Sequence, residues 1–477
     1  MAVIHPVIKK VLYSPGTNWQ LRFLGLTSGL LFMITHLMPE TVPLQLVALI
    51  PLLYGLARRN GSLYMAGTMG IYFALGFAFP QVFVLKLWAG ISIPLTLYFC
   101  LLYSLFALGA AWLLDRQSVA SALGIAALMV VTDWVNVTAL PMWGTAQSLA
   151  RPWSAYPALI QFVCYTGITG IIFFVTGAQA LVITGLLHSG RRVSCGLALI
   201  ILAAVYGVMN YLPSREQPVG SVRVAAMGWT TDVSPSAIDD RDISAEQFFE
   251  EAVSNAAAHG AKIITSPELV FIYDGLNTGW TELFSRIART YGEVLVVGYR
   301  DFPDHKNRAF LMDTGGVIRT EHTKTHLTPV ETFNKGDGSI HTIETGGILV
   351  GAMICQDDNF TDLSRRMGAA DVGVVGVPTL DWEPIRKSHF QNGIHRAIES
   401  RYAVMRAACN GISAIISPRG EVLAKKDHYE EGSGIVWADV PIYKTKTLYS
   451  RFGNWLPLVC GIYLIVIAVA GIRWKNG

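Results

Sequence analysis

Cys355, Glu268 and Lys324 are the residues whose types and settings could together carry out nucleophilic chemistry. Cys355 follows the apolar run 347–354, a pattern that predicts a buried strand with a thiol at its end. Glu268 stands in the same way after the β-like run 262–267. A free thiol is mostly protonated at neutral pH, so it needs a base for its proton and a cation or N–H donors for the oxyanion. We therefore predict Cys355 as the nucleophile, Glu268 as its base and Lys324 as the cation.

The composition is that of an integral membrane protein. Of the 477 residues, 52% are hydrophobic and 15% are charged, and the mean hydropathy is +0.41. These values lie outside the range of soluble globular proteins. A net charge of +3 is too small for a chain of this length to indicate a nucleic-acid partner. Four of the six cysteines lie in apolar runs, without metal-ligand spacing, and are interpreted as apolar fillers: Cys100, Cys164, Cys195 and Cys460.

Apolar runs predict about eight membrane-spanning helices. Each run has nearly the length that a bilayer core demands, and they cover roughly 22–38, 42–57, 62–83, 88–114, 118–134, 158–187, 195–212 and 455–473. Basic residues that flank the runs fall mainly on one side if every run crosses, and the positive-inside rule makes that side the cytoplasm. Seven crossings then export the polar part of the chain, and the eighth returns the C-terminus.

The chain therefore divides into three parts. Residues 1–213 form an N-terminal transmembrane region, 214–440 an extracytoplasmic catalytic domain, and 441–477 a return segment with a C-terminal transmembrane helix. The polar domain alternates predicted strands (222–227, 262–265, 294–298, 348–355 and 371–377) with predicted helices (248–259 and 391–408). Turn signals at 314–316 and 417–420 add two hairpins. The pattern predicts a layered α/β fold with a mixed sheet.

Three short motifs of the polar domain resemble the nitrilase-like carbon–nitrogen hydrolases. Ser266-Pro-Glu268, Lys324-Thr-His-Leu327 and Met353-Ile-Cys355 match that superfamily's glutamate, lysine and cysteine motifs in its chain order. The resemblance implies an α/β/β/α sandwich with a Glu-Lys-Cys triad. Further residues follow in the order seen in one membrane-bound branch, the apolipoprotein N-acyltransferases: Asp133-Trp134, Gln147, Asp381-Trp382, His389, Arg396-Ala-Ile-Glu399, Arg406-Ala407 and Asn410-Gly411.

Membership of this branch implies a function and a location. The family transfers an acyl chain from a phospholipid, through a thioester on the cysteine, to the N-terminal amine of a diacylglyceryl-cysteine on a lipoprotein precursor. Applied to this chain, the thioester forms on Cys355, and the backbone N–H of Gln356 joins Lys324 in stabilising the oxyanion. The resemblance implies no metal and no cofactor. It also implies a multi-pass monomer in a bacterial inner membrane, with the catalytic domain in the periplasm.

The chain departs from the family pattern near the triad. Glu331 comes seven residues after Lys324, where the family usually has eight, and Gln356-Asp357 replace an aromatic residue and a glutamate after the cysteine. We expect Glu331 and Asp357 to be supporting carboxylates. Candidates for substrate contact are Trp382, His389 and Trp143, the last also as an interfacial anchor.

Three alternative functions compete with this prediction. A membrane-tethered amidase or nitrilase would use water, in place of an amine, to resolve the acyl-enzyme. A paralogous acyltransferase would use another acceptor. A scaffold without catalytic activity is disfavoured because Glu268, Lys324 and Cys355 are all retained.

Overall fold

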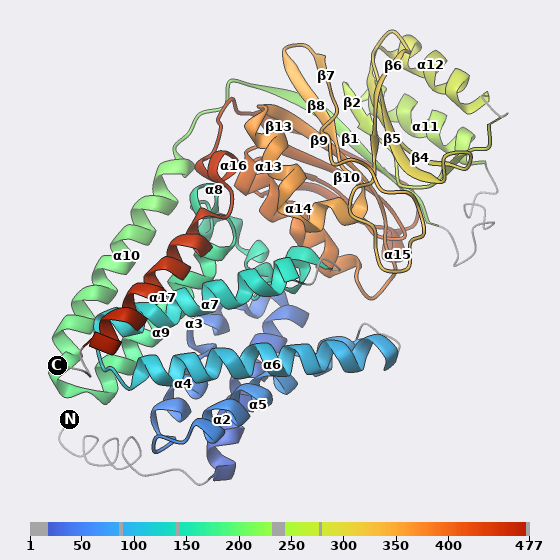
Figure 1. The fold of residues 1–477 in the computed structure, drawn as a ribbon. Helices are drawn as coiled ribbons and strands as arrows, with labels where there is room; N and C mark the ends of the chain where they lie inside the picture. The colour runs from blue at the N-terminus through green and yellow to red at the C-terminus, as the bar shows by residue number, and fades with distance from the viewer. Residues whose placement is uncertain (1–17, 85–88, 140–142, 231–243, 276–278, 474–477) are drawn as a thin grey trace.

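The computed structural model describes residues 18–84, 89–139, 143–230, 244–275 and 279–473. Its N-terminal half is a bundle of helices that ends with α10 (Arg192–Ser214). An α/β half follows and lies against one end of the bundle (Figure 1). The last helix, α17 (Trp455–Arg473), returns to the bundle and packs mainly on α7 (Val119–Ala139).

Within the described residues, five helical stretches are long and apolar enough to cross a membrane. They are Pro39–Ala57, Gly90–Leu114, Val119–Thr138, Thr169–Leu187 and Ser189–Ser214. Two shorter apolar helices, Leu63–Ala78 and Trp455–Ala470, accompany them. The 20-residue helix α2 (Asn18–Leu37) packs mainly against α5 (Leu63–Val84). Several apolar helices are therefore present at the predicted positions.

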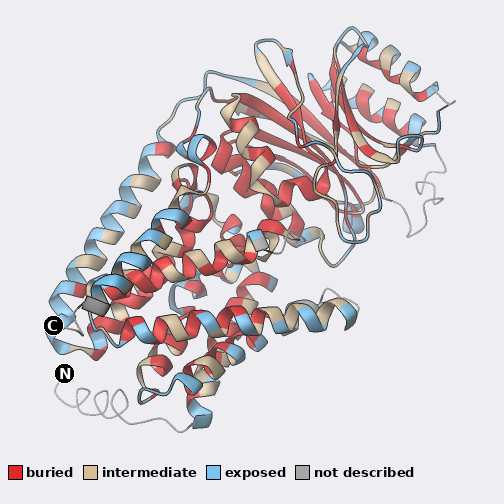
Figure 2. Cartoon of the chain, in the orientation of Figure 1, coloured by how far each residue is buried: buried red, intermediate tan, exposed pale blue. Residues whose placement is uncertain are grey.

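The outer helices present apolar side chains away from the bundle. The outward faces of α10 and α17 are largely exposed (Figure 2), and the exposed side chains there include Leu197, Ile201 and Val205 of α10 and Ile462 and Ile465 of α17. A soluble protein rarely exposes such an extended apolar surface. These faces fit contact with lipid acyl chains.

The predicted helix 158–187 is wrong in its first third. Helix α9 begins only at Thr169, and the chain before it forms three 3-10 turns and a short helix: η2 (Gly144–Gln147), η3 (Arg151–Ala155), η4 (Pro157–Leu159) and α8 (Val163–Thr166). Gly167 separates α8 from α9 with a φ of +66°, and a β-carbon there would lie 2.4 Å from the Tyr449 ring. Proline residues at the starts of η3 and η4 also prevent a continuous helix. Segment 144–166 is therefore irregular, and it packs against the α/β half.

Two sheets form the α/β half. The first has the order β13-β1-β2-β4-β5-β6, with β3 also paired to β4, and the second has the order β12-β11-β10-β9-β8-β7. The strands of the first are β1 (Gly220–Gly228), β2 (Ile263–Thr265), β3 (Phe271–Tyr273), β4 (Val294–Asp301), β5 (Lys306–Met312), β6 (Ile318–Thr323) and β13 (Gly434–Ile442). Those of the second are β7 (Thr342–Thr345), β8 (Ile348–Ala352), β9 (Val372–Leu380), β10 (Ala403–Cys409), β11 (Ile412–Ile416) and β12 (Val422–Asp427).

The sheets pack face to face, with helices on both outer faces (Figure 1). One apolar cluster joins residues of both sheets, among them Val224, Val296, Val350 and Val374. Helices α11 (Ala245–Ala258) and α12 (Gly279–Tyr291) cover the first sheet, and α13 (Thr361–Ala369) and α14 (Arg386–Ser400) cover the second. The predicted α/β/β/α sandwich is confirmed.

The predicted helix 391–408 is wrong in its second half. Helix α14 ends at Ser400, where Arg401 adopts a left-handed φ of +59°. The following run, Ala403–Cys409, is the fully buried strand β10, which pairs in parallel with β9 from Ala403↔Val374 to Cys409↔Leu380. Alanine and methionine favour helices in isolation, but pairing in the centre of a sheet overrides that preference.

Helix α14 is the layer between the second sheet and the helix bundle. It packs on η3 and α8, and the Glu399 carboxylate accepts a hydrogen bond at 3.0 Å from the N–H of Ile168, at the start of α9. His395, which is buried, contacts the carbonyl of Arg151 at 2.9 Å through Nε2. Burial lowers the pKa of the His395 imidazole to about 3. This contact therefore holds the two halves together with a neutral imidazole.

The His395→Gln variant tests that contact, because a glutamine amide can still donate to the Arg151 carbonyl but cannot titrate. The pKa of His395 in the folded protein lies below its ordinary value of 6.5. As the pH falls, the unfolded wild-type chain therefore binds a proton at this histidine at a higher pH than the folded protein does. Stability should fall by about 1.4 kcal/mol per pH unit as the pH drops below that value. Thermal unfolding in detergent between about pH 7 and about pH 5 should show a smaller pH dependence in the variant. An unchanged slope would contradict this assignment.

Candidate active site

The three predicted reactive residues lie on loops that leave strands of both sheets. Glu268 follows β2, Lys324 follows β6 directly, and Cys355 follows β8 by three residues. Gly298 allows the glutamate loop to approach β9, since a β-carbon there would lie 2.7 Å from the Pro267 carbonyl oxygen and 2.9 Å from the Pro378 side chain. Glu268, on the loop after β2, bonds to the end of β9, which pairs in parallel with β8. The loops after β2 and after β8 therefore meet across the two sheets.

The Glu268 carboxylate is buried and bonded through both oxygens. Oε1 accepts hydrogen bonds from Lys324 Nζ at 2.8 Å and from Asn307 Nδ2 at 2.6 Å. Oε2 accepts from the backbone N–H of Leu380, at the end of β9, at 2.7 Å. The carboxylate therefore ties the first sheet to the second and is held in one orientation.

Lys324 lies between two carboxylates. Its ammonium donates to Glu268 and, at 2.7 Å, to Glu331 Oε1, while Glu331 Oε2 accepts from the Thr328 N–H at 2.7 Å. Burial alone would lower the pKa of Lys324, but the Cys355, Glu268 and Glu331 acids raise it above its ordinary value. The lysine is therefore a permanent cation. The short spacing between Lys324 and Glu331 does not prevent their contact.

Cys355 is buried beside this pair. Its Sγ donates to the carbonyl oxygen of Leu380 at 3.6 Å, so the thiol and the Glu268 carboxylate bind the same residue of β9. The backbone of Cys355 has a φ of +45°, in the left-handed region that non-glycine residues rarely adopt. Burial raises the pKa of the Cys355 thiol well above its ordinary value, and Glu268 raises it further, whereas Lys324 lowers it. The thiol is therefore neutral at rest, and a base would have to remove its proton for the sulfur to act as a nucleophile.

Asp357 fixes the turn that carries the thiol. One of its oxygens accepts from the N–H groups of Thr325 and His326, at 3.1 and 2.8 Å. The other lies 2.9 Å from His322 Nε2 and accepts from the Ile354 N–H at 3.1 Å. Burial would raise the pKa of Asp357, but the histidines hold it below its ordinary value. The carboxylate thus clamps the cysteine turn η6 (Cys355–Asn359) to the lysine loop.

The same turn contacts the irregular segment of the helix bundle. Gln356 Oε1 accepts from Asn359 Nδ2 at 2.7 Å. The carbonyl oxygen of Asn359 accepts from Thr145 Oγ1 of η2 at 2.8 Å. The cysteine turn is therefore braced from the α/β half by Asp357 and from the bundle by Thr145.

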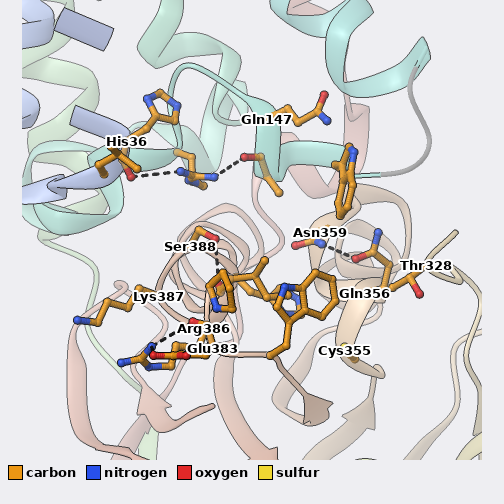
Figure 3. Close-up of a pocket in the computed structure, with 18 of the residues that line it drawn as sticks. His36, Gln147, Thr328, Cys355, Gln356, Asn359, Glu383, Arg386, Lys387 and Ser388 are labelled. Atoms are coloured by element: carbon orange, nitrogen blue, oxygen red, sulfur yellow. Dashed lines mark hydrogen bonds and ion pairs between the residues drawn. The ribbon is translucent and has the colours of Figure 1, made fainter. Parts of the chain in front are cut away.

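A cavity of about 470 Å³ lies between the two halves and reaches Cys355. Its bundle wall includes apolar side chains of α2, α5 and α6 (Ala89–Leu114), among them Leu37, Phe77, Leu95 and Phe99. Figure 3 shows His36 and Gln147 on this wall, and Cys355, Gln356 and Ser388 across from them. The cavity is thus apolar on its bundle side and polar near the thiol.

The three residues predicted to contact substrate all line this cavity. Trp143 precedes η2, Trp382 follows β9 with 37% of its surface exposed, and His389 is a buried residue of α14. Gln356 lines the cavity as well. The structure therefore gathers these side chains around one space with Cys355, although they come from three separate segments.

Two polar residues of the site were not predicted. Asn307 is fully buried in β5 and donates to Glu268, but its sequence setting does not distinguish it from a surface asparagine. His322 stands two residues before Lys324, on a strand where alternate residues share a face. That spacing could have indicated that the side chains of His322 and Lys324 lie on the same face, next to the site.

Comparisons with known proteins agree with the two-part architecture. A family model described as "Apolipoprotein N-acyltransferase N-terminal domain" matches residues 28–181, and one described as "Carbon-nitrogen hydrolase" matches residues 243–448. The apolipoprotein N-acyltransferase of Gloeobacter violaceus is 26% identical, covering 88% of this chain and 88% of its own. That of Shewanella oneidensis is 23% identical, covering 83% and 84%. An amidase from Nesterenkonia sp. of known structure is 20% identical, covers 49% of this chain and 96% of its own, and has a TM-score of 0.40.

The clamp by Asp357 predicts a large effect of a small change. In Asp357→Asn an amide N–H₂ would face hydrogen-bond donors, so we expect a loss of about 2–3 kcal/mol in unfolding free energy. Alkylation of Cys355 should also become faster, because the turn is less restrained. The matched control is Asp362→Asn, since that side chain is 47% exposed, and it should change stability by less than about 0.5 kcal/mol. Equal stability of the two variants, measured by thermal unfolding, would exclude the clamp.

Proposed function

Because the chain belongs to the apolipoprotein N-acyltransferase family, we propose that it transfers an acyl chain from a membrane phospholipid to the N-terminal amine of a diacylglyceryl-cysteine on a lipoprotein. The acyl group is carried as a thioester on Cys355. Glu268 is the base and Lys324 the electrostatic stabiliser, with Glu331 holding the lysine. The enzyme works as a monomer and needs no metal or cofactor.

The observation that carries the proposal is the cavity at the boundary between the two halves. Cys355 belongs to the α/β half, but Leu37, Phe77, Leu95 and Phe99 of the bundle face the same space. A hydrolase acting on soluble amides has no use for an apolar wall made by membrane helices. An enzyme that acts on a lipid ester does use such a wall, because burial against apolar side chains stabilises the acyl chain of the ester.

In the first half-reaction Glu268 removes the Cys355 proton as sulfur attacks the ester carbonyl. The oxyanion that develops is stabilised by the Lys324 ammonium and by the backbone N–H of Gln356. Glu268 then passes its proton to the leaving glycerol oxygen, and the C–O bond breaks. The raised pKa of the thiol supports this sequence, because proton removal is coupled to attack and no stable thiolate precedes it.

In the second half-reaction the lipoprotein amine attacks the thioester. The C–N bond forms, Glu268 takes a proton from nitrogen, and that proton goes to sulfur as the C–S bond breaks. The free thiol and the amide result. Trp382 and Trp143, which line the cavity, contact the substrates.

Charge distribution supports an extracytoplasmic catalytic half in a bacterial inner membrane. Arg58 and Arg59 lie in the loop between α4 (Ile50–Ala57) and α5. Arg59 pairs with Asp115 of the α6–α7 loop, so these loops meet at one end of the bundle. Arg192 begins α10 and Arg191 directly precedes it, at the end of the helix far from the α/β half (Figure 1). Positive residues favour the cytoplasmic side. The α/β half therefore lies outside the cytoplasm.

The nucleophile and base are tested by trapping the acyl-enzyme. Purified wild type, incubated with phospholipid labelled in its acyl chain, should acquire a hydroxylamine-sensitive label on Cys355, and Cys355→Ala should acquire none. Glu268→Gln should accumulate at least about 100-fold less thioester, because the thiol then has no base. The matched control is Glu344→Gln on strand β7, which should be labelled like wild type.

Two outcomes would contradict this assignment. Label on a residue other than Cys355 would exclude the nucleophile, and normal labelling of Glu268→Gln would exclude the base. Addition of a synthetic diacylglyceryl peptide should then move the label to the peptide amine. Release of free fatty acid without peptide acylation would indicate an amidase-type hydrolase.

Orientation is tested by fusing a phosphatase that is active only after export. A fusion after Lys444, which is exposed between β13 and α16 (Leu448–Phe452), should be active. A fusion after residue 477 should be inactive, because the last helix returns the chain to the cytoplasm. The opposite pattern would place the catalytic half beside the cytoplasmic leaflet and exclude lipoprotein maturation.

A further inference from the structure

A buried aspartate–histidine pair lies at the cavity and has no part in the mechanism above. Asp381 Oδ1 lies 2.7 Å from His389 Nδ1, and both side chains are almost completely buried. Asp381 Oδ2 accepts from Arg406 Nη2 at 2.8 Å. An ionised carboxylate can only accept hydrogen bonds, so Nδ1 carries the proton, and Nε2 of a neutral His389 has a free lone pair.

The second nitrogen of this histidine is unsatisfied. Within the described part of the chain, His389 Nε2 has no hydrogen-bond partner, although His389 lines the cavity that reaches Cys355. His322 Nδ1 and His395 Nδ1 are likewise buried without a partner among the described residues, but neither residue lines the cavity. The buried His428 has both ring nitrogens bonded, to Gly432 and Ser413. His389 therefore combines an imidazole oriented by Asp381, an unpartnered nitrogen and a place in the cavity lining, which fits a proton acceptor.

The chemistry of the acceptor leaves one proton without a destination. An α-amino group has an ordinary pKa of about 8, so it arrives mostly as an ammonium ion at neutral pH. Two protons must leave that nitrogen before it becomes an amide nitrogen. Glu268 transfers one of them to the departing sulfur. The other needs a second base, and Lys324 is already protonated.

We propose that His389 Nε2 accepts the first proton of the acceptor ammonium, an inference that rests on the proposed function. The ammonium N–H bond breaks, its proton moves to Nε2, and the resulting amine keeps the electron pair that attacks the thioester carbonyl. Asp381 stabilises the imidazolium through Nδ1. The imidazolium releases its proton to water after product leaves, which restores the resting enzyme.

Charged groups surround His389 on several sides. Arg406 Nη2 lies 3.2 Å from Nδ1 and also donates to Asp381. The other titratable or charged groups around it come from several elements. They are Asp358 and Cys355 of η6, Arg386, Lys387 and His395 of α14, Glu383 of the preceding loop, and His36 and Arg151 across the cavity.

The test is the second half-reaction of His389→Gln, starting from acyl-enzyme already formed with labelled phospholipid. Transfer to a synthetic diacylglyceryl peptide should be about 100-fold slower than in wild type at neutral pH. The deficit should shrink as the pH passes about 8, where the amine is neutral without help. Hydroxylamine is already neutral at neutral pH, so it should cleave both thioesters at equal rates.

The matched control is His259→Gln. His259 is exposed, follows α11 on the other outer face of the sandwich, and stacks its ring on Trp437 of β13. This control variant should form and transfer the acyl group as wild type does at every pH. A deficit in His389→Gln that is the same at all pH values, or that also affects hydroxylamine, would assign His389 a structural role. Wild-type transfer rates in His389→Gln would exclude any role. If wild type itself formed no thioester, the proposed function would fail first.

Discussion

The buried contact between Lys324 and Glu268 is the interaction on which the rest of the site depends. The two residues leave strands of one sheet, and the second Glu268 oxygen binds the end of a strand in the other. An isolated buried charge costs several kcal/mol, so each group requires the other as well as Glu331 and Asn307. The polar groups that we propose as catalytic therefore also hold the two sheets together at this edge. Reactivity and local stability share the same hydrogen bonds.

A second constraint is the fixed docking of the α/β half on the helix bundle. Helix α14 lies between the second sheet and the bundle, and Arg401 at its end donates to Gln161 at 2.9 Å. Gln161 donates in turn to the carbonyl of Arg419, in the β11–β12 turn, at 2.9 Å. Neither half contains the complete cavity, because its apolar wall belongs to one and its thiol to the other. The irregular segment 144–166 is what makes this close contact possible.

The sequence predicted those features that local patterns determine. Buried strands such as β9 were visible as continuous apolar runs, and Glu268, Lys324 and Cys355 were visible because each follows a strand. The strand Ala403–Cys409 was misread as helix because its residues favour helices, and only pairing with β9 decides its conformation. The irregular start of span 158–187 was missed because hydropathy reports burial in an apolar environment and not backbone shape. Asn307 was missed because its partner, Glu268, is remote in the chain.

The apolar wall of the cavity also affects how the substrate concentration near the thiol is set. Leu95 and Phe99 belong to a helix that is long and apolar enough to cross a membrane, and Phe77 belongs to a shorter apolar helix. In a bilayer that surrounds these helices, a substrate that reaches Cys355 past them would arrive by lateral diffusion within one leaflet. Its abundance is then a surface density, set by lipid composition, and not a molar concentration in water. The rate of such an enzyme would respond to dilution of its substrate among other lipids, even when the total amount of that substrate in the sample is constant.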